Sequence, residues 1–430
     1  MTWPSANAAR HAGVMKTISP TLAINEEIAR RASAGLDTVP LGFGEANVPV
    51  HPALVRRLAD AAAQNHYGAV AGSADLRAAA AGYWNRRGLP TDSSNVVGAP
   101  GSKPILYALF QALGGPIALP KPSWVSYAAQ ASMLGVEAHL LRTRDGEGGV
   151  PDPQLLDSTA QTLAADGRPM QVVLVTLPDN PTGTLASVET VREVCEVARR
   201  HDLVVISDEI YRDLIHSPQT AYVSPAEFAP ERTIVTAGLS KSHALGGWRI
   251  GVARFPDEPV YADVRASVLT AASEIWSAAP QPVQAAAAWA YEEPAELGGH
   301  IAQSRRLHGE IARATAAVFR RHRTHVADPA GGFYVYPSFD SVRATLRERH
   351  SIVSSHDLAA TLLEQFGVAT LPGTAFGDDP ERLTLRVATS MLNGRDDAER
   401  AEALAADDPS TLPWVIQRLD QLDEALAALT

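Results

Sequence analysis

Residues 170–207, MQVVLVTLPDNPTGTLASVETVREVCEVARRHDLVVIS, hold the pattern that decides the fold. Two nearly continuous apolar runs, 170–177 and 203–207, have the length and β-branched content of strands buried on both faces. Between them, Ser187 followed by Glu189 resembles a helix start, and apolar residues then recur at helical spacing. Strand, helix and strand at these distances predict a βαβ unit and therefore a parallel sheet.

Further runs extend this sheet and then give way to a different pattern. Residues 233–238 (TIVTAG) and 249–255 (RIGVARF) are again β-branched and nearly continuous. After about residue 300, Arg-rich helical stretches alternate with strand-like ones such as GGFYVYPSF (331–339) and LTLRVATS (383–390). We predict an α/β fold with a mostly parallel central sheet, followed by a smaller α+β domain.

Length and composition exclude several classes of protein. A chain of 430 residues is too long for one small core and suggests about two domains. Its net charge of −11 argues against nucleic acid as a partner, which would need a basic surface. The single cysteine, Cys195, excludes an internal disulfide framework and a multi-cysteine zinc site, and its helical context favours a core thiol. Neither a run of about 20 apolar residues nor the apolar core of a signal peptide is present, so we expect a cytoplasmic protein without a membrane partner. We predict no metal site.

Three segments place polar groups at the start of a helix or the end of a strand. GAPGSK (98–103) precedes an apolar helix, and it is either an ordinary turn or an anion site made by backbone N–H groups; its spacing is not that of a Walker A loop. Asn180, after the first buried strand, is either a turn former or a hydrogen-bond donor to a ligand. Asp208, after the second strand, either caps a helix or has a partner such as a protonated ring nitrogen. Tyr211 could project toward the same ligand.

The stretch AGLSKSHALGGWRIG (237–251) places a lysine in a tight loop of small residues. A desolvated amine close to cations has a lowered pKa and acts as a nucleophile and a base, which suits Lys241 to react with a buried carbonyl. Arg249 could pair with a phosphate through two parallel hydrogen bonds. Taken together, these segments supply an anion cradle, a carboxylate for a pyridinium, donors for a phenolate and an amine for an aldehyde. This combination describes pyridoxal phosphate.

Three motifs in a fixed order carry a resemblance to a known family: NPTG (180–183), SDEIY (207–211) and SK with GGWRIG (240–251). The chain resembles the fold-type I pyridoxal-phosphate enzymes, and within them the class I/II aminotransferases of the aspartate aminotransferase superfamily. The resemblance extends over nearly the whole chain, from Val14 to Ser390. It implies pyridoxal 5′-phosphate as the cofactor, held as an internal aldimine by Lys241.

The resemblance also implies a role for each matching residue. Lys241, Asp208 and Tyr211 are the implied catalytic residues: the lysine carries the cofactor and moves a proton between the substrate Cα and the cofactor C4′, and Asp208 keeps the pyridine nitrogen protonated. Tyr211 and Asn180 hydrogen-bond the phenolic oxygen. Trp124 either stacks on the ring or is a core residue. The implied cofactor-binding set is Tyr67, Gly101, Ser102, Lys103, Trp124, Asn180, Asp208, Tyr211, Ser240, Lys241 and Arg249. The implied substrate-binding set is Gly44, Asn180 and Arg386, where the arginine clamps the substrate carboxylate.

The resemblance implies an assembly as well. Tyr67 resembles the tyrosine that reaches the phosphate of the neighbouring subunit, which implies a homodimer with shared active sites. We expect a large cofactor-binding domain over residues 46–310. Residues 1–45 plus 311–430 would form a small domain, and closure of the two would exclude water.

Three departures from the family pattern concern the substrate side. Asp179 stands where a neutral residue, often Asn, is usual, and GEANVPVHP (44–52) replaces the common GEPDF segment. His243 stands where an aromatic residue is frequent, and it either packs behind the lysine loop or takes part in catalysis. No second arginine can be identified for a side-chain carboxylate, so aspartate is not the favoured amino donor.

We predict an aminotransferase that moves the amino group of an L-amino acid to a 2-oxo acid. The alternative is a pyridoxal-phosphate-dependent lyase, β/γ-replacement, cyclising or oxidising enzyme of specialised biosynthesis on the same fold. Lys241 argues against a non-catalytic binding protein with this fold. A nicotinamide dehydrogenase is disfavoured because no G-x-G-x-x-G follows a first strand.

Overall fold

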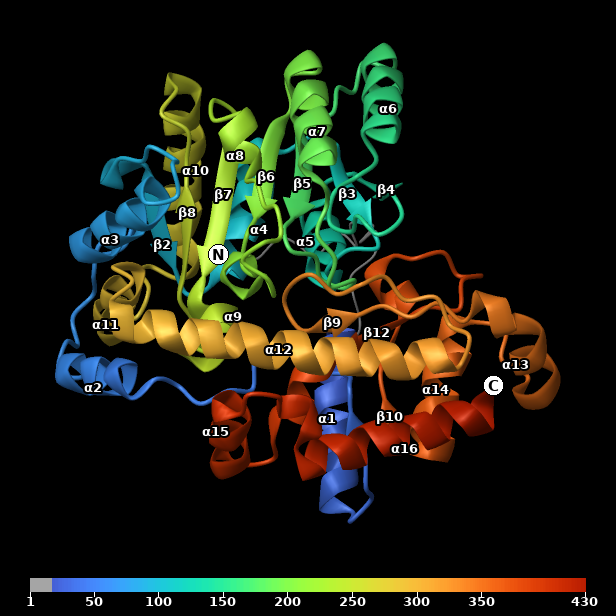
Figure 1. The fold of residues 1–430 in the computed structure, drawn as a ribbon. Coiled ribbons are helices and arrows are strands. Elements are labelled where there is room, and N and C mark those ends of the chain that lie inside the picture. Colours follow the sequence, from blue (N-terminus) through green and yellow to red (C-terminus); the bar gives the residue numbers. More distant parts are fainter. Residues whose placement is uncertain (1–17) are drawn as a thin grey trace, which may run out of the picture.

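A seven-stranded sheet forms the centre of the larger part of the molecule in the computed structural model, which describes residues 18–430 (Figure 1). Its strand order is β2-β8-β7-β6-β5-β3-β4. The strands are β2 (Val96–Ala99), β3 (Ile117–Lys121), β4 (Ala138–Arg142), β5 (Val172–Thr176), β6 (Val204–Asp208), β7 (Thr233–Gly238) and β8 (Gly251–Arg254). Six of them are parallel to one another, and β8 runs antiparallel to both of its neighbours. The prediction of a mostly parallel sheet is confirmed. The run at 249–255 is the exception, because the short segment 239–250 turns the chain back instead of carrying it across the sheet.

Helices cover both faces of this sheet. One face packs against α4 (Ser102–Leu113), α5 (Val125–Leu134) and α10 (Pro259–Ile275). The other face packs against α6 (Pro153–Ala165), α7 (Val188–Arg200), α8 (Pro225–Phe228), α3 (Ala74–Asn85) and α11 (Gln281–Tyr291), with α2 (Pro52–Ala61) joining the last two. We call this part of the molecule the sheet unit.

The βαβ unit predicted from residues 170–207 is present as β5, α7 and β6. The Ser187 side chain accepts a hydrogen bond from the Thr190 N–H at 3.2 Å, which satisfies one of the free donors at the start of α7. The apolar stripe of α7, including Val191 and Val194, is buried, and so is Cys195. The single cysteine is therefore a core thiol, as predicted.

A second apolar core lies in what we call the C-terminal unit. It contains a two-stranded parallel pair, β1 (Val39–Pro40) with β10 (Val368–Ala369), and an antiparallel sheet of β11 (Leu371–Pro372), β12 (Leu385–Ala388) and β9 (Tyr334–Val335). Its helices are α1 (Pro20–Ser33), α13 (Arg343–His350), α14 (Ser355–Phe366), α15 (Asp397–Ala405) and α16 (Pro413–Leu429). Val39, Leu41 and Val48 pack into the same core as residues of α14 and α16. The N-terminal segment is thus joined to the C-terminal part of the chain.

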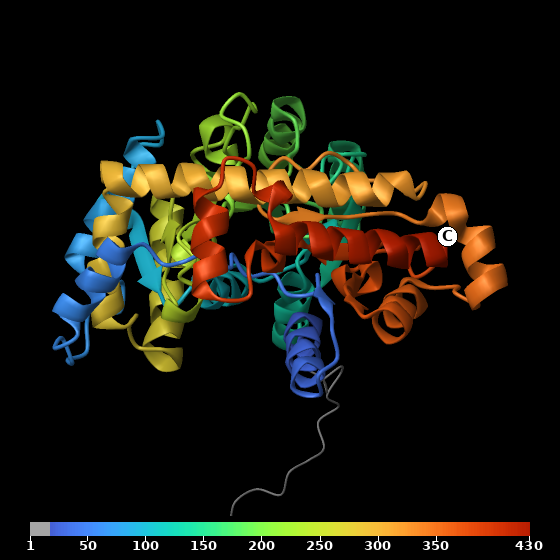
Figure 2. The same cartoon turned by 60° about the horizontal axis from the view of Figure 1, so that its bottom comes forward.

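The long helix α12 (Ala295–Arg321) runs across the molecule beneath the sheet unit and into the C-terminal unit (Figure 1). Figure 2 shows α12 and α16 side by side, and residues of both belong to the C-terminal core. The predicted domain limit at residue 310 falls inside this helix and stays a prediction, and residues 1–17 of the predicted small domain lie outside the described residues. The N-terminal segment in which the sequence showed no signal-peptide pattern also lies outside the described residues. None of the helices formed by residues 18–430 combines the length and apolar character that crossing a membrane requires.

The pairing of β5, β6 and β7 places three polar side chains in one row at the carboxyl ends of the strands. Thr176 lies opposite Asp208, and Asp208 lies opposite Thr236. In an open parallel sheet, ligands bind outside these strand ends.

Candidate active site

A cavity of about 430 Å³ lies at the carboxyl ends of these strands, between the sheet unit and the C-terminal unit. Most of the predicted site residues line it: Gly44, Ser102, Lys103, Trp124, Asn180, Asp208, Tyr211, Ser240, Lys241, Arg249 and Arg386. Gly101 precedes the lining residue Ser102 at the start of α4, and neither Gly101 nor Tyr67 is among the lining residues. Segments more than 300 residues apart in the sequence therefore meet at one site.

Lys241 lies in α9 (Leu239–Ser242), directly after β7. Its Nζ donates a hydrogen bond to the Gly44 carbonyl oxygen at 2.7 Å. The pKa of Lys241 is lowered to about 8, chiefly by burial; the positive charges of Arg386 and Arg249 contribute to the lowering, and Glu45 opposes it. The amine is therefore partly neutral near pH 8, as a nucleophile or a base requires.

Asp208 is the last residue of β6, and its carboxylate is buried. Its Oδ2 accepts a hydrogen bond from the Tyr127 hydroxyl at 2.8 Å, and its Oδ1 accepts one from the Thr236 hydroxyl at 3.1 Å. Burial raises the pKa of Asp208 to about 6, because these two hydrogen bonds only partly offset the loss of water. A cationic group in the cavity would lower that pKa again.

Tyr127 and Thr236 were missed by the sequence analysis. Tyr127 stands three residues after Trp124 in the motif KPSWVSY, and the two rings meet edge to face at 5.2 Å in the structure. That spacing is a usable signal, since residues three apart on a helix lie on one side. Thr236 meets Asp208 only through the pairing of β6 with β7, and nothing local in the sequence indicates it.

Asn180 and Tyr211 lie together on the other side of the cavity. The Asn180 amide donates to the Tyr211 hydroxyl at 3.4 Å, and the two hydroxyls of Tyr211 and Tyr334 are 2.8 Å apart. The Asn180 Oδ1 atom is buried and has no hydrogen-bond partner among residues 18–430. Burial raises the pKa of the Tyr211 hydroxyl well above its usual range, so it acts as a neutral donor. Tyr334 was also missed, because its segment was recognised only as a strand.

An anion cradle forms where the start of α4 meets the beginning of β8. A Cβ atom at Gly251 would lie 2.4 Å from the backbone nitrogen of Ser102, so this close approach requires glycine. A Cβ at Gly101 would lie 2.3 Å from the Arg249 guanidinium. Arg249 does not start the strand, as the sequence analysis assumed: it adopts a left-handed conformation at φ 59° two residues earlier, which turns its side chain back toward α4. Exposed N–H groups at a helix start, with Ser240 and Arg249 beside them, suit a phosphate.

Lys103 also lies in this region, in the first turn of α4. Its Nζ sits 5.0 Å from the centre of the Trp124 ring. Burial lowers the pKa of Lys103, and the positive charge of Arg249 lowers it further. The amine therefore favours an anionic partner in the cavity.

Arg386 reaches the cavity from β12 and is almost fully buried, with 1% of its surface exposed. One terminal nitrogen donates to the Gly42 carbonyl, and the Nε atom has no partner among residues 18–430. The guanidinium lies between the rings of Tyr334 and Phe376, 5.2 and 5.0 Å from their centres. A buried guanidinium with an unused donor suits a carboxylate.

Three residues of interest, Tyr67, Asp179 and His243, do not line the cavity. Tyr67 is 91% exposed, so any contact it makes with a neighbouring subunit stays a prediction. His243 hydrogen-bonds the Ser242 hydroxyl at 2.9 Å and lines a separate cavity of about 230 Å³ behind the lysine loop. Asp179 is buried and accepts hydrogen bonds from the N–H and hydroxyl of Thr182, outside the cavity. Of the departing GEANVPVHP segment, Gly44 and Glu45 face the cavity.

The residues present fit pyridoxal phosphate by several independent observations. The start of α4 suits the phosphate, and the Asn180 amide N–H with the neutral Tyr211 hydroxyl offers donors suited to the phenolic oxygen. Within the described chain the buried Asp208 carboxylate has no cationic partner within 4 Å, and a pyridinium would supply one. Lys241 offers a desolvated amine. Fold and site together define a fold-type I enzyme that depends on pyridoxal phosphate.

Comparisons with known proteins agree with this class. The family model "Aminotransferase class I and II" matches residues 37–404. An aspartate aminotransferase of Geobacillus stearothermophilus is 30% identical over 387 residues, covering 87% of this chain and 93% of that protein. An aspartate/prephenate aminotransferase of Thermus thermophilus is 31% identical, covering 89% of this chain and 94% of its own. The solved structure of the aspartate aminotransferase from Thermus thermophilus with maleate shares the fold, with a TM-score of 0.79 at 24% identity, over 96% of this chain and all of the other.

The chain belongs to the class I and II aminotransferase family. It is a pyridoxal-phosphate-dependent aminotransferase, as predicted, and the alternative lyase, replacement, cyclising or oxidising chemistry is not favoured.

Proposed function

We propose that this aminotransferase uses Lys241 as its catalytic amine, Asp208 as the partner of the cofactor ring nitrogen and Arg386 as the anchor for the substrate carboxylate. One observation carries the proposal: a buried amine with a pKa of about 8, a buried carboxylate and a buried arginine with an unused donor line a single cavity. An L-amino acid and a 2-oxo acid exchange their amino and oxo groups there.

When bound, pyridoxal phosphate supplies an aldehyde that takes up amino groups and a ring that stabilises negative charge at the substrate Cα. The chain binds and orients this group. Ser102, Ser240 and Arg249 would hold its phosphate at the start of α4, and Asn180 and Tyr211 would hydrogen-bond its phenolic oxygen. Asp208 supplies negative charge, held in place by Tyr127 and Thr236.

Lys241 performs the proton transfer. Because its pKa is about 8, a substantial fraction of the amine is neutral at pH 8 and able to accept a proton from the substrate Cα. Its Nζ is held toward the substrate side by the Gly44 carbonyl. With the cofactor bound, the same nitrogen would return the proton to the cofactor C4′.

Substrate orientation falls to Arg386 and to the segment around Gly44. The guanidinium can form two parallel hydrogen bonds to the α-carboxylate. A Cβ at Gly44 would lie 2.4 Å from the Tyr334 hydroxyl, so only glycine leaves room for this arrangement.

The identity of the amino donor is a separate proposal. The names of the relatives make aspartate the first amino donor to assay and prephenate the first 2-oxo acid acceptor. Among residues 18–430, Arg249 and Arg386 are the arginines that line the cavity, and both already have proposed roles, which supports a donor without a side-chain carboxylate. Among the described residues, Lys103 is the remaining cation in the cavity wall that could bind a side-chain carboxylate. If Lys103→Met loses turnover of aspartate but keeps turnover of other amino donors, Lys103 binds the side-chain carboxylate of aspartate.

We further propose a homodimer in the cytoplasm, in which Tyr67 of each subunit contributes to the other's site. The near-complete exposure of the Tyr67 side chain supports a contact with a second copy, because a large aromatic ring gains from burial. Cell fractionation with antibody detection checks the location.

The proposed roles are tested by the turnover of Lys241→Ala, Arg386→Lys and the wild type with an amino acid and 2-oxoglutarate. Lys241→Ala should lose at least about 1,000-fold in kcat, because the proton-transfer group is gone. Arg386→Lys should raise the KM for the amino acid about 10- to 100-fold, because one of two parallel hydrogen bonds is lost. Wild-type turnover by Lys241→Ala would refute the proposal.

A further inference from the structure

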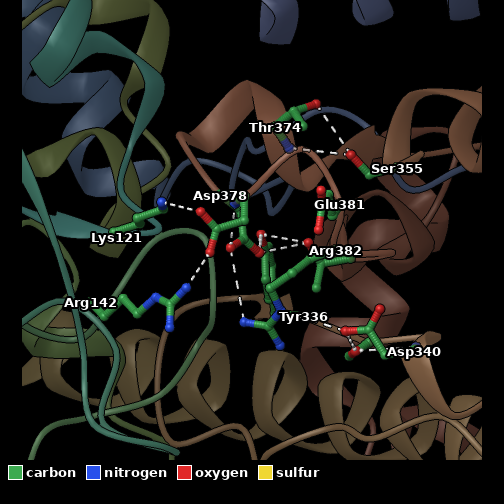
Figure 3. A network of polar contacts seen from close by, with 12 residues as sticks. Lys121, Arg142, Tyr336, Asp340, Ser355, Thr374, Asp378, Glu381 and Arg382 are labelled. Carbon is green, nitrogen blue, oxygen red and sulfur yellow. Dashed lines mark hydrogen bonds and ion pairs between the residues drawn. The ribbon is translucent and has the colours of Figure 1, made fainter. Parts of the chain in front are cut away.

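One aspartate of the C-terminal unit lies between two cations of the sheet unit. Asp379 follows the turn η5 (Gly373–Phe376) and precedes β12. Its Oδ1 accepts a hydrogen bond from Lys121 Nζ at 2.5 Å, and its Oδ2 accepts one from the Arg142 guanidinium at 2.8 Å. Lys121 and Arg142 are the last residues of β3 and β4 and lie opposite each other in the sheet. Figure 3 shows both side chains reaching toward the loop that carries Asp378.

The same loop is fixed firmly within the C-terminal unit. Asp378, the neighbouring residue, accepts hydrogen bonds from the Tyr336 hydroxyl at 2.9 Å and from the Thr384 hydroxyl at 2.7 Å (Figure 3). Its Oδ1 also accepts the Asp379 backbone N–H at 2.9 Å. Because Tyr336 directly follows β9 and Thr384 directly precedes β12, these hydrogen bonds fix the loop next to both strands.

The loop also reaches the active site. The backbone N–H of Ser123 donates to the Phe376 carbonyl oxygen at 2.9 Å, and Ser123 is followed by Trp124, which lines the cavity. On the other side, the Phe376 ring lies 5.0 Å from the Arg386 guanidinium. The segment from Phe376 to Asp379 thus connects an aromatic residue of the sheet unit with the arginine of the C-terminal unit.

We propose that Asp379 is a positioning residue, whose bridge to Lys121 and Arg142 holds the two units in the arrangement that brings Arg386 and Trp124 to the same cavity. Asp379 does not touch the reacting atoms, because it lines a different cavity of about 250 Å³. The inference rests on the role proposed above for Arg386.

The strength of the bridge follows from its exposure. The side chains of Asp379 and Lys121 are 29% and 19% exposed, and that of Arg142 is 72% exposed. Ion pairs at this level of exposure are individually weak and screened by salt. The two ion pairs of Asp379 together can favour a closed arrangement of the sheet unit and the C-terminal unit over an open one. They are too weak to be needed for folding.

The test compares Asp379→Asn with Asp423→Asn as purified holoenzymes. Asp423 is a matched control, because it too is a partly exposed carboxylate with two nitrogen partners, Arg321 and His322, but both partners lie in the C-terminal unit. We expect Asp379→Asn to raise the KM for the amino acid about three- to tenfold, with kcat within about twofold and cofactor retention unchanged. Asp423→Asn should keep the wild-type KM.

Salt dependence separates an electrostatic bridge from a general structural effect. Raising the salt from about 0.02 M to about 0.5 M should raise the KM of the wild type toward that of Asp379→Asn and leave the variant nearly unchanged. Asp379→Glu should restore much of the wild-type KM. Lys121→Met and Arg142→Met should each give part of the effect, and they keep the test decisive if Asp379→Asn does not fold.

A wild-type KM and salt response in Asp379→Asn, or an equal change in Asp423→Asn, would overturn the positioning role. If Arg386→Lys raises the KM while Asp379→Asn does not, only this inference fails. If Arg386→Lys also leaves the KM unchanged, the proposed substrate role of Arg386 fails, and the positioning role fails with it.

Discussion

At the scale of single residues, burial gives the polar side chains of this site properties that exposed ones lack. It lowers the pKa of Lys241 to about 8 and raises that of Asp208 to about 6. The two shifts have one cause, since removing water disfavours the charged form of either group. In this protein the shifted groups belong to one cavity, as is common for catalytic sites.

Asp208→Asn should lower kcat by about 100- to 10,000-fold, because the neutral amide supplies no negative charge for the ring nitrogen. The fold should survive, since the amide oxygen can still accept the hydrogen bond from Tyr127 or from Thr236. Asp202→Asn is the control, an exposed aspartate just before the same strand. Steady-state kinetics measure kcat for both variants, and Asp202→Asn should keep the wild-type value. Near-wild-type turnover by Asp208→Asn would refute the role proposed for Asp208.

Asp179 offers a prediction about stability and pH. Burial raises the pKa of this carboxyl to about 7, against about 3.9 in the unfolded chain. Since the folded state binds the proton more tightly, the stability this group contributes is fully present below pH 4 and is lost as pH rises through 7. Asp179→Asn stays neutral, so at pH 8 the cofactor-free variant should exceed the wild type in free energy of unfolding by roughly 1–4 kcal/mol.

Urea unfolding of the cofactor-free proteins at pH 5 and pH 8 measures this difference. The advantage of Asp179→Asn should shrink markedly at pH 5, where the wild-type carboxyl is protonated in the folded state. A difference that does not change with pH would show that Asp179 stays ionised in the fold.

At the scale of elements, the proposed phosphate cradle depends on how closely β8 approaches the start of α4. The backbone of Gly251 touches that of Gly101 and Ser102, so a side chain at position 251 would push the helix start away. Backbone N–H groups bind an anion only when they converge on it. The cradle is therefore a property of a helix–strand contact and not of one residue.

Gly251→Ala should weaken binding of pyridoxal phosphate at least about tenfold, because its Cβ would lie 2.4 Å from the Ser102 nitrogen. Gly299→Ala, which adds a methyl group in open space on α12, should bind the cofactor as the wild type does. Titration of the cofactor-free proteins with pyridoxal phosphate provides the two affinities. Equal affinities would mean that this contact is not what holds the phosphate.

Much at this scale could be predicted from the sequence. The pattern around Ser187 gave the start of α7 and its buried face, because capping and periodicity are local properties. The reversed direction of β8 and the left-handed turn at Arg249 could not be predicted, since both result from how β7, β8 and α4 pack. For the same reason Thr236 and Tyr334, which meet Asp208 and Tyr211 only in space, were missed.

At the scale of the whole molecule, the site belongs to two units of the chain. The sheet unit provides Lys241 and Asp208, and the C-terminal unit provides Arg386 through β12. The sequence also led us to predict two domains, and their limits stay a prediction. The bridge from Asp379 to Lys121 and Arg142 could not be predicted, because residues more than 230 positions apart share no local signal.

The proposed homodimer, in which each active site combines residues of two subunits, can be tested by complementation. Lys241→Ala and Tyr67→Ala subunits should each be weakly active alone. After they are mixed and exchange subunits, half of the sites in a mixed dimer combine an intact Lys241 with an intact Tyr67. Activity should rise well above the sum of the two parents, and no rise despite proven subunit exchange would exclude a shared site.

The most direct measurement is to reduce the holoenzyme with borohydride and locate the modified lysine by peptide mass spectrometry. The chain contains only four lysines, Lys16, Lys103, Lys121 and Lys241, and Lys103 lies in the same cavity. The central claim predicts the pyridoxyl group on Lys241 and none on Lys103. Stoichiometric modification of Lys103, or of any lysine other than Lys241, would contradict it.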